Sequence, residues 1–493
     1  MRIPLSKQDR YILRCVLRFS RNRNTRLHIV GGFIRDIVLG RERANPDIDF
    51  AVKKNAIGFG RRLAKYLKSG FVVLDRENGC ARLVKRIKER IYTLDFTDFR
   101  GRNLAQDLGK RDFTINTLAV ELGAFLKSSD YPLIDPYGGL KDLKSGLVRI
   151  INPEAYDNDP LRILRAFSLS CALNFKIEPR TLSLARKEKN KLSGVSSERI
   201  RDELFKVLAG SRSYESLVQL DRCRITDIIF PEIKAMRKLE QGPYHHLDVW
   251  QHTLETLRQL EKIVKDLNRN RDIKEYLDGE ISSGRHRREL VKLGALMHDI
   301  GKPGTLRIEE GKLKFHGHER LGADMLEGIS QRLKLANSET AALKKMILLH
   351  LRPGYLADNP VLTRRAKFRF LRDAGEEAAS ILLISLADQR ATKGYLTTPE
   401  SRRRHERVVR RLIKEYFRRI KEIKPARLID GNDLIRKFKL EPSPLIGRVL
   451  SEIEEARAIN KVRTIKQALC LAGEIIKKEA RDGRDKNRKA FGG

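Results

Sequence analysis

The sequence predicts an α+β domain followed by an all-helical remainder. In the first 150 residues, short runs rich in β-branched and aromatic residues alternate with helical patterns; these runs are DIDFAV, FVVLD, CARLVKRI and IYTLDFTDF. Beyond about residue 152 the strand patterns stop, and apolar residues recur at helical spacing nearly to the end of the chain. We therefore expect a small mixed sheet at the start of the chain and helices in the rest.

Composition indicates a polyanionic partner. The chain has 493 residues, with 102 Lys and Arg against 64 Asp and Glu, and a formal net charge of +38. Surfaces built from ion-pair networks, as in thermostable proteins, are enriched in both signs of charge, whereas this excess has one sign. Such an excess is typical of proteins that bind nucleic acid, which is the partner we expect.

Cysteine usage and hydropathy bear on the compartment. The five cysteines are isolated in the sequence, without the close pairs of a zinc site or the framework of a secreted domain. The sequence shows no signal peptide and no run of about eighteen apolar residues. We therefore expect reduced thiols and a cytoplasmic protein that has no membrane partner.

A glycine pair precedes the first helix expected after a strand. In VGGFIRD, Gly31 and Gly32 stand before a helix that runs to Gly40, with Arg35 in its first turns. Backbone N–H groups at such a turn bind anions, and an arginine adds a charged fork for a phosphate. The alternative is an ordinary structural turn, which the glycine pair alone does not exclude.

A pair of aspartates follows in the segment NPDIDFAV. The two-residue period of a strand places Asp47 and Asp49 on one face and the apolar residues between them on the other. Two adjacent carboxylates favour a bound cation, and paired Mg²⁺ ions serve phosphoryl transfer in this way. Asp95, on a later strand, is the candidate for a third ligand, and Asp98 competes with it.

Histidines are concentrated in the second half of the chain. Eight of the ten fall between His245 and His350. Histidine and aspartate without cysteine suit one or two divalent ions such as Mn, Ni, Co, Fe or Zn, with positions left open for water. The alternative is a scaffold that has lost metal binding, but such scaffolds usually lack ligands. The candidate ligands are His252, His298, Asp299, His318, His350 and Asp388.

Two resemblances follow from these motifs. GGFIRDIVLGRERANPDIDF, KRDFTINTLAV and NDPLRILRA resemble the bacterial class II tRNA nucleotidyltransferases and poly(A) polymerases over nearly the whole chain. The adjacent His298 and Asp299 resemble the HD phosphohydrolase superfamily. The first resemblance implies a nucleotidyltransferase head with a polymerase-β-like palm and a small mixed sheet, followed by an all-α neck, an HD body and a tail.

The resemblance also implies domain limits. These are a head at 1–150, a helical neck for nucleobase and RNA binding at 151–240, an HD metal-binding domain at 241–395, a helical tRNA-binding tail at 396–480 and a disordered basic end at 481–493.

The resemblance assigns roles in the head. The glycine turn of Gly31 and Gly32, with Arg35, would hold a triphosphate, and Asp47 and Asp49 would bind Mg²⁺ with Asp95. The segment RDFTIN would line the sugar and phosphates of the nucleotide through Arg111, Asp112 and Asn116. For Asp112 a helix N-cap is the alternative.

The segment DNDPLRILRA is expected to choose the base. We expect a helix with Asp159 as N-cap and Pro160 in its first position. Cytosine and adenine both present an amine donor beside a ring-nitrogen acceptor, which an Asp and an Arg complement. The resemblance gives this role to Asp159 and Arg162, supported by Arg165. The alternative is that Asp159 caps the helix and pairs with Arg162 on its surface.

Two positions near this segment depart from the family pattern. Asn158 replaces the usual Glu, and Ser168 stands where an Arg is common. The first departure affects the positioning of the base-reading residues, and the second removes a positive charge near the nucleotide. Both bear on specificity and not on the reaction class.

The sequence thus predicts a template-independent RNA nucleotidyltransferase. It would add C, A or both to the tRNA 3′ end from CTP and ATP, with Mg²⁺ in the head and release of pyrophosphate. A metal-dependent phosphohydrolase activity in the HD domain is a second possible function. The alternatives are a poly(A) polymerase, an HD phosphohydrolase with an RNA-docking head and a non-catalytic RNA-binding protein.

Overall fold

The computed structural model describes residues 5–127, 131–422 and 427–490, with the backbone alone over 480–490. The chain divides into two compact units, residues 1–231 and 232–493, and each is described by itself. Within the described residues, no helix is both long and apolar enough to span a membrane.

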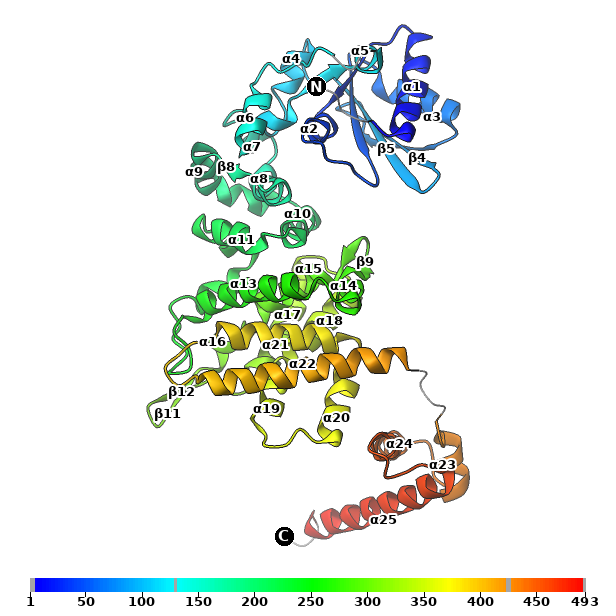
Figure 1. Ribbon diagram of the computed structural model, residues 1–493, viewed down its shortest axis with the longest axis vertical. Helices are drawn as coiled ribbons and strands as arrows, with labels where there is room; N and C mark the ends of the chain where they lie inside the picture. The colour runs from blue at the N-terminus through cyan, green and yellow to red at the C-terminus, as the bar shows by residue number, and fades with distance from the viewer. Residues whose placement is uncertain (1–4, 128–130, 423–426, 491–493) are drawn as a thin grey trace. The chain divides into compact units, whose positions relative to one another are not determined.

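A six-stranded mixed sheet forms the head, as predicted (Figure 1). Its strand order is β3-β4-β5-β2-β1-β6. The central strands β2 and β5 run parallel, whereas the other neighbouring pairs run antiparallel. The strands are β1 (Leu27–Val30), β2 (Asp47–Val52), β3 (Gly70–Asp75), β4 (Cys80–Ile87), β5 (Arg90–Asp98) and β6 (Ala119–Glu121).

Two helices, α1 (Lys7–Arg21) and α3 (Ala56–Leu67), lie on one side of this sheet (Figure 1). The apolar residues of the central strands fill the space beneath them: Phe50 and Phe96 stack at 4.7 Å, and Phe59 of α3 lies 5.3 Å from Phe96. Because side chains alternate along a strand, the neighbours of these phenylalanines point to the opposite face. The other head helices are α2 (Gly32–Val38), α4 (Leu104–Leu108), η1 (Thr114–Asn116), α5 (Leu122–Lys127) and α6 (Gly139–Ser145).

The rest of the first unit is the predicted helical neck. Its helices are α7 (Ala155–Asn158), α8 (Arg162–Leu173), α9 (Pro179–Glu188), η2 (Lys189–Gly194), α10 (Ser197–Ala209), α11 (Ser213–Arg222) and α12 (Thr226–Ile229). The prediction that strands end near residue 152 is wrong in detail, since three short two-stranded ribbons occur, β7 with β8, β9 with β10 and β11 with β12. Strands of two or three residues carry no periodic signal. They are β7 (Leu147–Val148), β8 (Lys176–Ile177), β9 (Glu280–Ser282), β10 (Arg285–His286), β11 (Arg307–Glu309) and β12 (Lys312–Lys314).

Helix α21 (Ala378–Ala391) is the centre of the second unit. It is buried on nearly every side and packs against α13, α15, α18 and α22 (Figure 1). The candidate metal ligands lie near the ends of α13, α15, α17 and α18 and on α21 itself. The other helices of this part of the unit are η3 (Pro231–Met236), α13 (Val249–Leu267), α14 (Arg271–Asp278), α15 (Arg287–Met297), α16 (Lys302–Thr305), α17 (His318–Arg332), α18 (Asn337–Leu349), α19 (Arg352–Asp358), α20 (Arg364–Ala374), η4 (Gly375–Glu377) and α22 (Pro399–Lys421).

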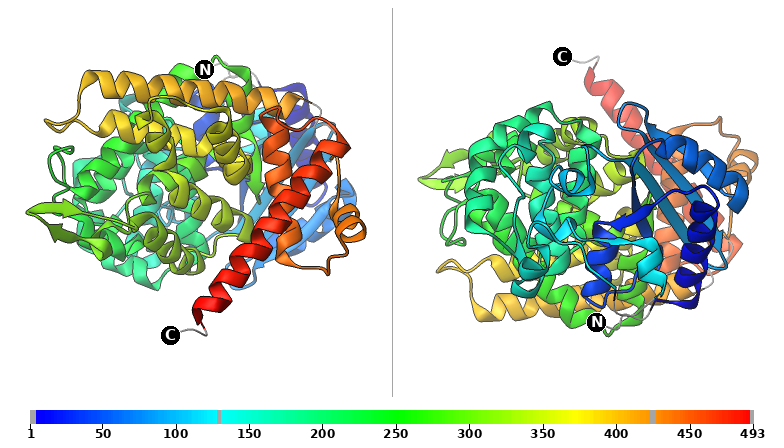
Figure 2. Two further views of the ribbon diagram at one scale, coloured as in Figure 1. Left: turned by 90° about the horizontal axis from the view of Figure 1, so that it is seen from below. Right: turned by 90° about the horizontal axis from the view of Figure 1, so that it is seen from above.

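Three helices form the tail, α23 (Gly431–Phe438), α24 (Pro444–Ala458) and α25 (Ile465–Ala490), drawn in orange and red in Figure 2. They share a small apolar core, and α24 joins α20 through the buried Glu455, which accepts from Arg369 Nε at 2.7 Å. The basic end was expected to be disordered over 481–493. Helix α25 instead continues to Ala490, since the segment is rich in helix-forming Lys and Arg and lacks proline. Residues 491–493 lie outside the described residues.

Candidate active site and metal centre

Three carboxylates meet on the face of the sheet opposite α1 and α3. Asp47 and Asp49 begin β2, and Asp95 lies beside Asp49 in the parallel pairing of β2 with β5. One carboxylate oxygen from each lies within 4.8 Å of the others. Asp98 is not part of this cluster, because its Oδ1 accepts the Ala56 N–H at 2.7 Å at the start of α3. The structure therefore places Asp95, and not Asp98, beside the pair.

The electrostatics of this cluster favour a cation. Burial raises the pKa of Asp49 to about 6, and the neighbouring Asp47 and Asp95 contribute to the rise. Partial loss of solvent around its carboxylate, together with the neighbouring Asp95, also raises the pKa of Asp47, although the residue as a whole is exposed. Asp95 differs because Arg82 donates to both of its oxygens, at 2.8 and 2.7 Å. Oxygen ligands held this close to one another suit a hard divalent ion such as Mg²⁺.

The glycine turn borders these carboxylates. Gly31 has φ of +78°, which favours glycine, and a Cβ there would lie 2.7 Å from Arg111 Nη1 and 3.2 Å from Asp49 Oδ2. Arg111 Nη1 itself lies 3.9 Å from Asp49 Oδ2. The absence of a side chain at Gly31 therefore keeps open the space between an arginine and a carboxylate of the cluster. Gly32 follows as the first residue of α2.

Four of the predicted nucleotide-binding residues form one hydrogen-bonded network. Arg35 Nη1 donates to Asn116 Oδ1 at 2.7 Å, and Asn116 Nδ2 donates to Asp112 Oδ1 at 2.9 Å. Arg165 Nη2 reaches Asp112 Oδ2 at 2.7 Å. Burial alone would raise the pKa of Asp112, but Arg165 and Asn116 lower it to about 2. Asp112 accepts the N–H of Phe113, the residue that itself precedes η1, so it is part of this network and does not occupy the N-cap position.

The base-reading segment starts its helix later than the sequence predicts. Helix α8 begins at Arg162 and not at Pro160: Asp159 is extended and ends α7, and residues 160 and 161 form a turn before the helix. The alternative, a surface pair between Asp159 and Arg162, is not found within the described residues. Asp159 instead accepts from Arg199 Nη2 of α10 at 2.9 Å and from the Leu161 N–H at 3.2 Å. The side chain thus still caps the turn that leads into α8.

Arg162 has backbone partners. Its Nη1 donates to the Arg111 carbonyl at 3.0 Å, and its Nη2 donates to the Lys110 carbonyl at 2.9 Å. The guanidinium is buried, with only 8% of the residue exposed. Arg162 therefore ties α8 to the segment that carries Arg111 and Asp112.

Ser168 shows how the chain accommodates its departure from the family pattern. Its hydroxyl donates to the buried Glu203 at 2.5 Å, and Lys206 Nζ lies 2.6 Å from the other oxygen of Glu203. Arg165 lies 3.9 Å from the same carboxylate. Ser168 thus lies beside a buried carboxylate that is paired with Lys206 and close to Arg165. Asn158 is the last residue of α7.

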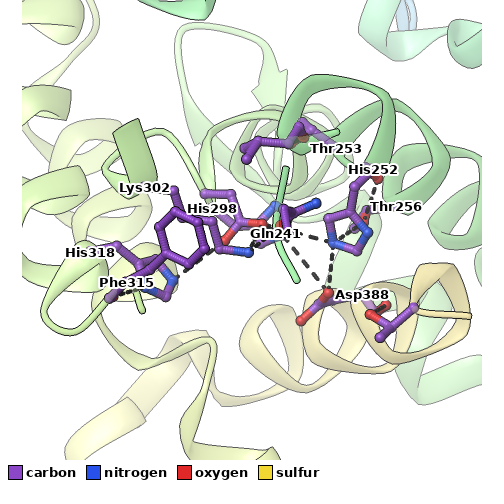
Figure 3. A network of polar contacts seen from close by, with 12 residues as sticks. Gln241, His252, Thr253, Thr256, His298, Lys302, Phe315, His318 and Asp388 are labelled. Atoms are coloured by element: carbon purple, nitrogen blue, oxygen red, sulfur yellow. Dashed lines mark hydrogen bonds and ion pairs between the residues drawn. The ribbon is translucent and has the colours of Figure 1, made fainter. Parts of the chain in front are cut away.

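All six candidate ligands in the second unit lie together, and Figure 3 labels four of them, His252, His298, His318 and Asp388. His252, His298 and Asp299 form one group, and Asp299, His318 and His350 form another, each with ligand atoms within 4.8 Å of one another. Asp388 of α21 lies beside the first group, with Oδ1 2.9 Å from His252 Nε2. Asp299 is shared, so the arrangement suits two neighbouring ions.

The histidine tautomers fit a metal centre. Nδ1 of His298, His318 and His350 lies 2.8, 2.8 and 2.6 Å from the carbonyl oxygen three residues earlier in the chain. A carbonyl only accepts, so each Nδ1 carries a proton, and in the neutral ring each Nε2 has a free lone pair. Nε2 of His318 and His350 face each other at 3.4 Å, and the buried Nε2 of His298 lies 3.1 Å from Asp299 Oδ2, which is also a candidate ligand. A cation between these lone pairs would satisfy all three.

Comparison with known proteins agrees with this geometry. Residues 27–149 match the Poly A polymerase head domain, residues 174–237 match the "Probable RNA and SrmB- binding site of polymerase A", and residues 249–393 match the HD domain. An A-adding tRNA nucleotidyltransferase of Deinococcus radiodurans is 30% identical over 447 residues, which is 89% of this chain and 93% of that protein. The chain belongs to the tRNA nucleotidyltransferase family.

Further members of the tRNA nucleotidyltransferase family are similar over most of the chain. A CC-adding enzyme of Thermus thermophilus is 28% identical over 450 residues, 89% of this chain and 91% of that protein. The fold is that of the Thermotoga maritima CCA-adding enzyme complexed with tRNA, with a TM-score of 0.63, 21% identity and 96% of each chain covered. The predicted family and fold class are confirmed.

Sequence reasoning missed four polar residues at these sites of the tRNA nucleotidyltransferase fold. Arg82 binds Asp95 in the head, and Arg199 binds Asp159 in the neck. In the HD centre, which is the cluster of the six candidate ligands of the second unit, Lys302 Nζ lies 2.7 Å from Asp299 Oδ2 and 2.6 Å from Gln241 Oε1. Lys302 had a signal, since it follows Asp299 by three residues in HDIGK, which is one helical turn. Arg82, Arg199 and Gln241 lie far along the chain from their partners, and no local pattern marks them.

Proposed function

We propose that this protein adds C, A or both to the 3′ end of tRNA, using CTP and ATP and releasing pyrophosphate. The observation that carries this proposal is the cluster of Asp47, Asp49 and Asp95 beside the glycine turn and Arg111. The names of the relatives, which are A-adding, CC-adding and multifunctional CCA proteins, support tRNA as the substrate.

The head residues would have different roles in the reaction. Asp47, Asp49 and Asp95 would hold Mg²⁺, which when bound promotes attack of the RNA 3′-hydroxyl on the α-phosphate and neutralises the triphosphate. Arg111 and the backbone at Gly31 would orient the triphosphate. Arg35 would act mainly on Asn116, because its guanidinium already donates to Asn116 and Asp36.

Base choice would fall to Asp159 and Arg162. A guanidinium has five N–H groups, and the three hydrogen bonds from Arg162 to carbonyl oxygens leave two for the ring nitrogen of cytosine or adenine. Asp159 would accept from the amine of the base, either beside Arg199 or in exchange for it. Uracil and guanine would place a carbonyl against Asp159 and an N–H against Arg162, which is unfavourable at both atoms.

Product analysis tests this proposal. The protein is incubated with Mg²⁺, CTP and ATP and with three tRNA transcripts that end before CCA, after C and after CC, and the products are sequenced. Complete, CC-only and A-only enzymes give different products from these transcripts. A long A tract would identify the poly(A) polymerase alternative, and no extension of any transcript would contradict the proposal.

RNA binding would use the basic helices from about residue 190 onward. Helix α22 carries Arg403, Arg407, Arg411 and Lys414 as exposed residues along one side, at spacings of three and four. Such a stripe suits phosphate contacts that read the shape of an RNA helix. We also propose a cytoplasmic location; none of the five cysteines, all within the described residues, is in a disulfide.

A second function, hydrolysis of phosphate esters, is favoured by the HD centre. The observation is that two overlapping ligand groups share Asp299 and that the histidines have their Nε2 lone pairs directed inward. Bound divalent ions would there polarise a phosphate and activate water. Assays with p-nitrophenyl phosphate and bis(p-nitrophenyl) phosphate, with Mn²⁺, Ni²⁺, Co²⁺, Fe²⁺ and Zn²⁺ in turn, test both the activity and the metal. No turnover with any ion would contradict it.

A further inference from the structure

The segment that precedes α13, residues 241–248, is held firmly against the loop that follows α21. The Tyr244 carbonyl accepts the Gly394 N–H at 2.7 Å and the Thr397 hydroxyl at 3.1 Å. A Cβ at Gly394 would lie 2.2 Å from the Pro243 carbonyl oxygen, so the two segments touch through their backbones. The position of the segment is therefore fixed by main-chain contacts.

The same segment forms one wall of the HD centre. Gln241 lies between Lys302 and His252 in the view of Figure 3, and it accepts from Lys302 at 2.6 Å. Gln241 Nε2 in turn donates to the Leu247 carbonyl at 3.2 Å, which closes the segment on itself. Its side chains therefore reach the ligand groups although no residue of the segment belongs to them.

His245 is the residue of this wall whose role is unexplained. Its ring stands edge-on to His252, with centroids 4.7 Å apart and an interplanar angle of 90°. Asp299, Asp388 and Lys302 are near enough to act on it electrostatically. Its Nδ1 is buried and has no hydrogen-bond partner among the described residues. A buried nitrogen without a partner is costly, and such groups commonly mark a ligand that binds there.

We propose that His245 is a further ligand of the ion at the first group, beside His252, His298, Asp299 and Asp388. This inference rests on the proposed metal centre and adds a residue to it. Three imidazoles and two carboxylates exceed the four ligands of a structural zinc site. The donor set therefore favours Mn²⁺, Fe²⁺, Co²⁺ or Ni²⁺, with a sixth position left for water or a phosphate oxygen.

The alternative is that His245 only packs against His252. A phenylalanine at this position keeps a ring of similar shape and the edge contact, but it has no nitrogen. His245→Phe therefore separates the two interpretations, and His245→Ala gives a second variant. The adjacent His246 is exposed, so His246→Ala is a matched control that removes an imidazole one residue away.

The test is Co²⁺ binding to the full chain after treatment with a chelator. Affinity is measured by calorimetric titration, coordination by the visible absorption of bound Co²⁺, and folding by circular dichroism. For His245→Phe and His245→Ala we expect Co²⁺ affinity to fall about tenfold or more, the scale seen even when residues that only support metal ligands are removed. The absorption spectrum should change as well, because one nitrogen donor is lost. His246→Ala should match the unsubstituted protein.

Two results would overturn the inference, and they differ in what else they overturn. If the folded His245→Phe protein has the affinity and spectrum of the unsubstituted protein, His245 is not a ligand, and the proposed metal centre stands. If the unsubstituted protein binds no Co²⁺, the metal centre fails and this inference fails with it.

Discussion

The carboxylate cluster of the head and the HD centre of the body both offer ligands to divalent ions, but they do so in different surroundings. In the head, Asp47, Asp49 and Asp95 converge on an open sheet face, with Asp47 exposed and Arg82 bound to Asp95. In the body, the histidine ligands are buried, and the Nδ1 atoms of His298, His318 and His350 are held by backbone carbonyls. An open set of oxygens suits an ion that arrives with a nucleotide, whereas a buried set with imidazoles suits an ion that stays.

The largest expected effect comes from the head. Asp49→Asn should abolish nucleotide addition while leaving tRNA affinity nearly unchanged, because the carboxylates hold the ions and the basic surface binds RNA. Incorporation of labelled CTP and ATP, and a filter-binding assay with tRNA, measure the two properties. Asp98→Asn is the control: it removes a carboxylate from the same sheet, at the start of α3, and addition should persist. Normal incorporation by Asp49→Asn would show that the cluster takes no part in the reaction.

The body should respond independently of the head. His298→Ala should lose tightly bound metal and any phosphoesterase activity, yet it should keep nucleotide addition, because the two ligand sets share no residue. Metal analysis of the dialysed protein and the incorporation assay give both readouts. A folded His298→Ala protein that no longer adds nucleotides would break the comparison, since the HD centre would then serve the polymerisation.

Salt should weaken tRNA binding steeply. With a net charge of +38, several phosphates are expected to be neutralised, and six to ten contacts lower affinity by about 10³-fold or more between 50 and 200 mM salt. Titrations with tRNA at several salt concentrations measure the slope of log affinity against log salt concentration. The comparison is hydrolysis, by the body, of a small phosphate ester with an uncharged leaving group, and its rate should vary far less with salt. A slope near zero would mean that the charge excess serves another purpose.

A smaller effect is expected at the base-reading segment. Asp159→Asn should keep the turn that leads into α8, since Asn caps as well as Asp, but discrimination against UTP and GTP should fall by about 1–3 kcal/mol. Incorporation of the four nucleotides is measured beside a thermal melt. Because Arg199 is the partner of Asp159, Arg199→Lys is an informative companion: it keeps the positive charge and alters the geometry of the pair. An unchanged melt together with unchanged base preference would mean that Asp159 only caps the turn and does not read the base.

The smallest effect concerns stability. Asp112→Asn should lower the free energy of unfolding of the first unit by about 2 kcal/mol at neutral pH, since a buried charged hydrogen bond is lost. The pKa of Asp112 is about 2 in the folded chain, below its ordinary 3.8, so the stabilisation is present above about pH 4 and is lost as the pH falls toward 2. The variant should therefore be less sensitive than the parent in that range.

The single tryptophan makes this effect assignable to a unit. Trp250 lies in α13 of the second unit, so its fluorescence reports the body, whereas circular dichroism reports both units. Asp112→Asn should shift the dichroism transition and leave the fluorescence transition in place. A shift in fluorescence of equal size would show that the two units unfold together.

Much of the head could be predicted because its signals are local. The period of two residues in DIDFAV placed Asp47 and Asp49 on one face, and the structure agrees, with Ile48 and Phe50 buried on the other. Asp95 was the candidate third ligand and Asp98 its competitor. They are three residues apart on β5, so strand alternation places them on opposite faces, and the pairing of Asp95 with Asp49 shows which face carries the cluster. Register depends on pairing between distant segments, which a single sequence does not display.

The neck shows the opposite case. Arg162 and Asp159 are three residues apart, and helical spacing suggested that they pair, yet each has a partner from elsewhere in the fold. Asp159 is extended, as a residue before proline should be, but the helix itself begins only at Arg162. Arg199 had no local signal at all.

The parallel register of β2 and β5 limits which insertions and deletions the protein can accept near Asp95. Asp95 faces Asp49 because β5 is anchored on both sides, to β2 and to β4, and the short Lys88–Glu89 turn joins β4 to β5. One residue inserted within β5 ahead of Asp95 would turn its carboxylate into the apolar core and bring Leu94 to the active face. Two residues inserted there would keep the face but would move the carboxylate about 6.6 Å along β5, away from Asp49. In this part of the gene, insertions and deletions of either parity should therefore abolish nucleotide addition.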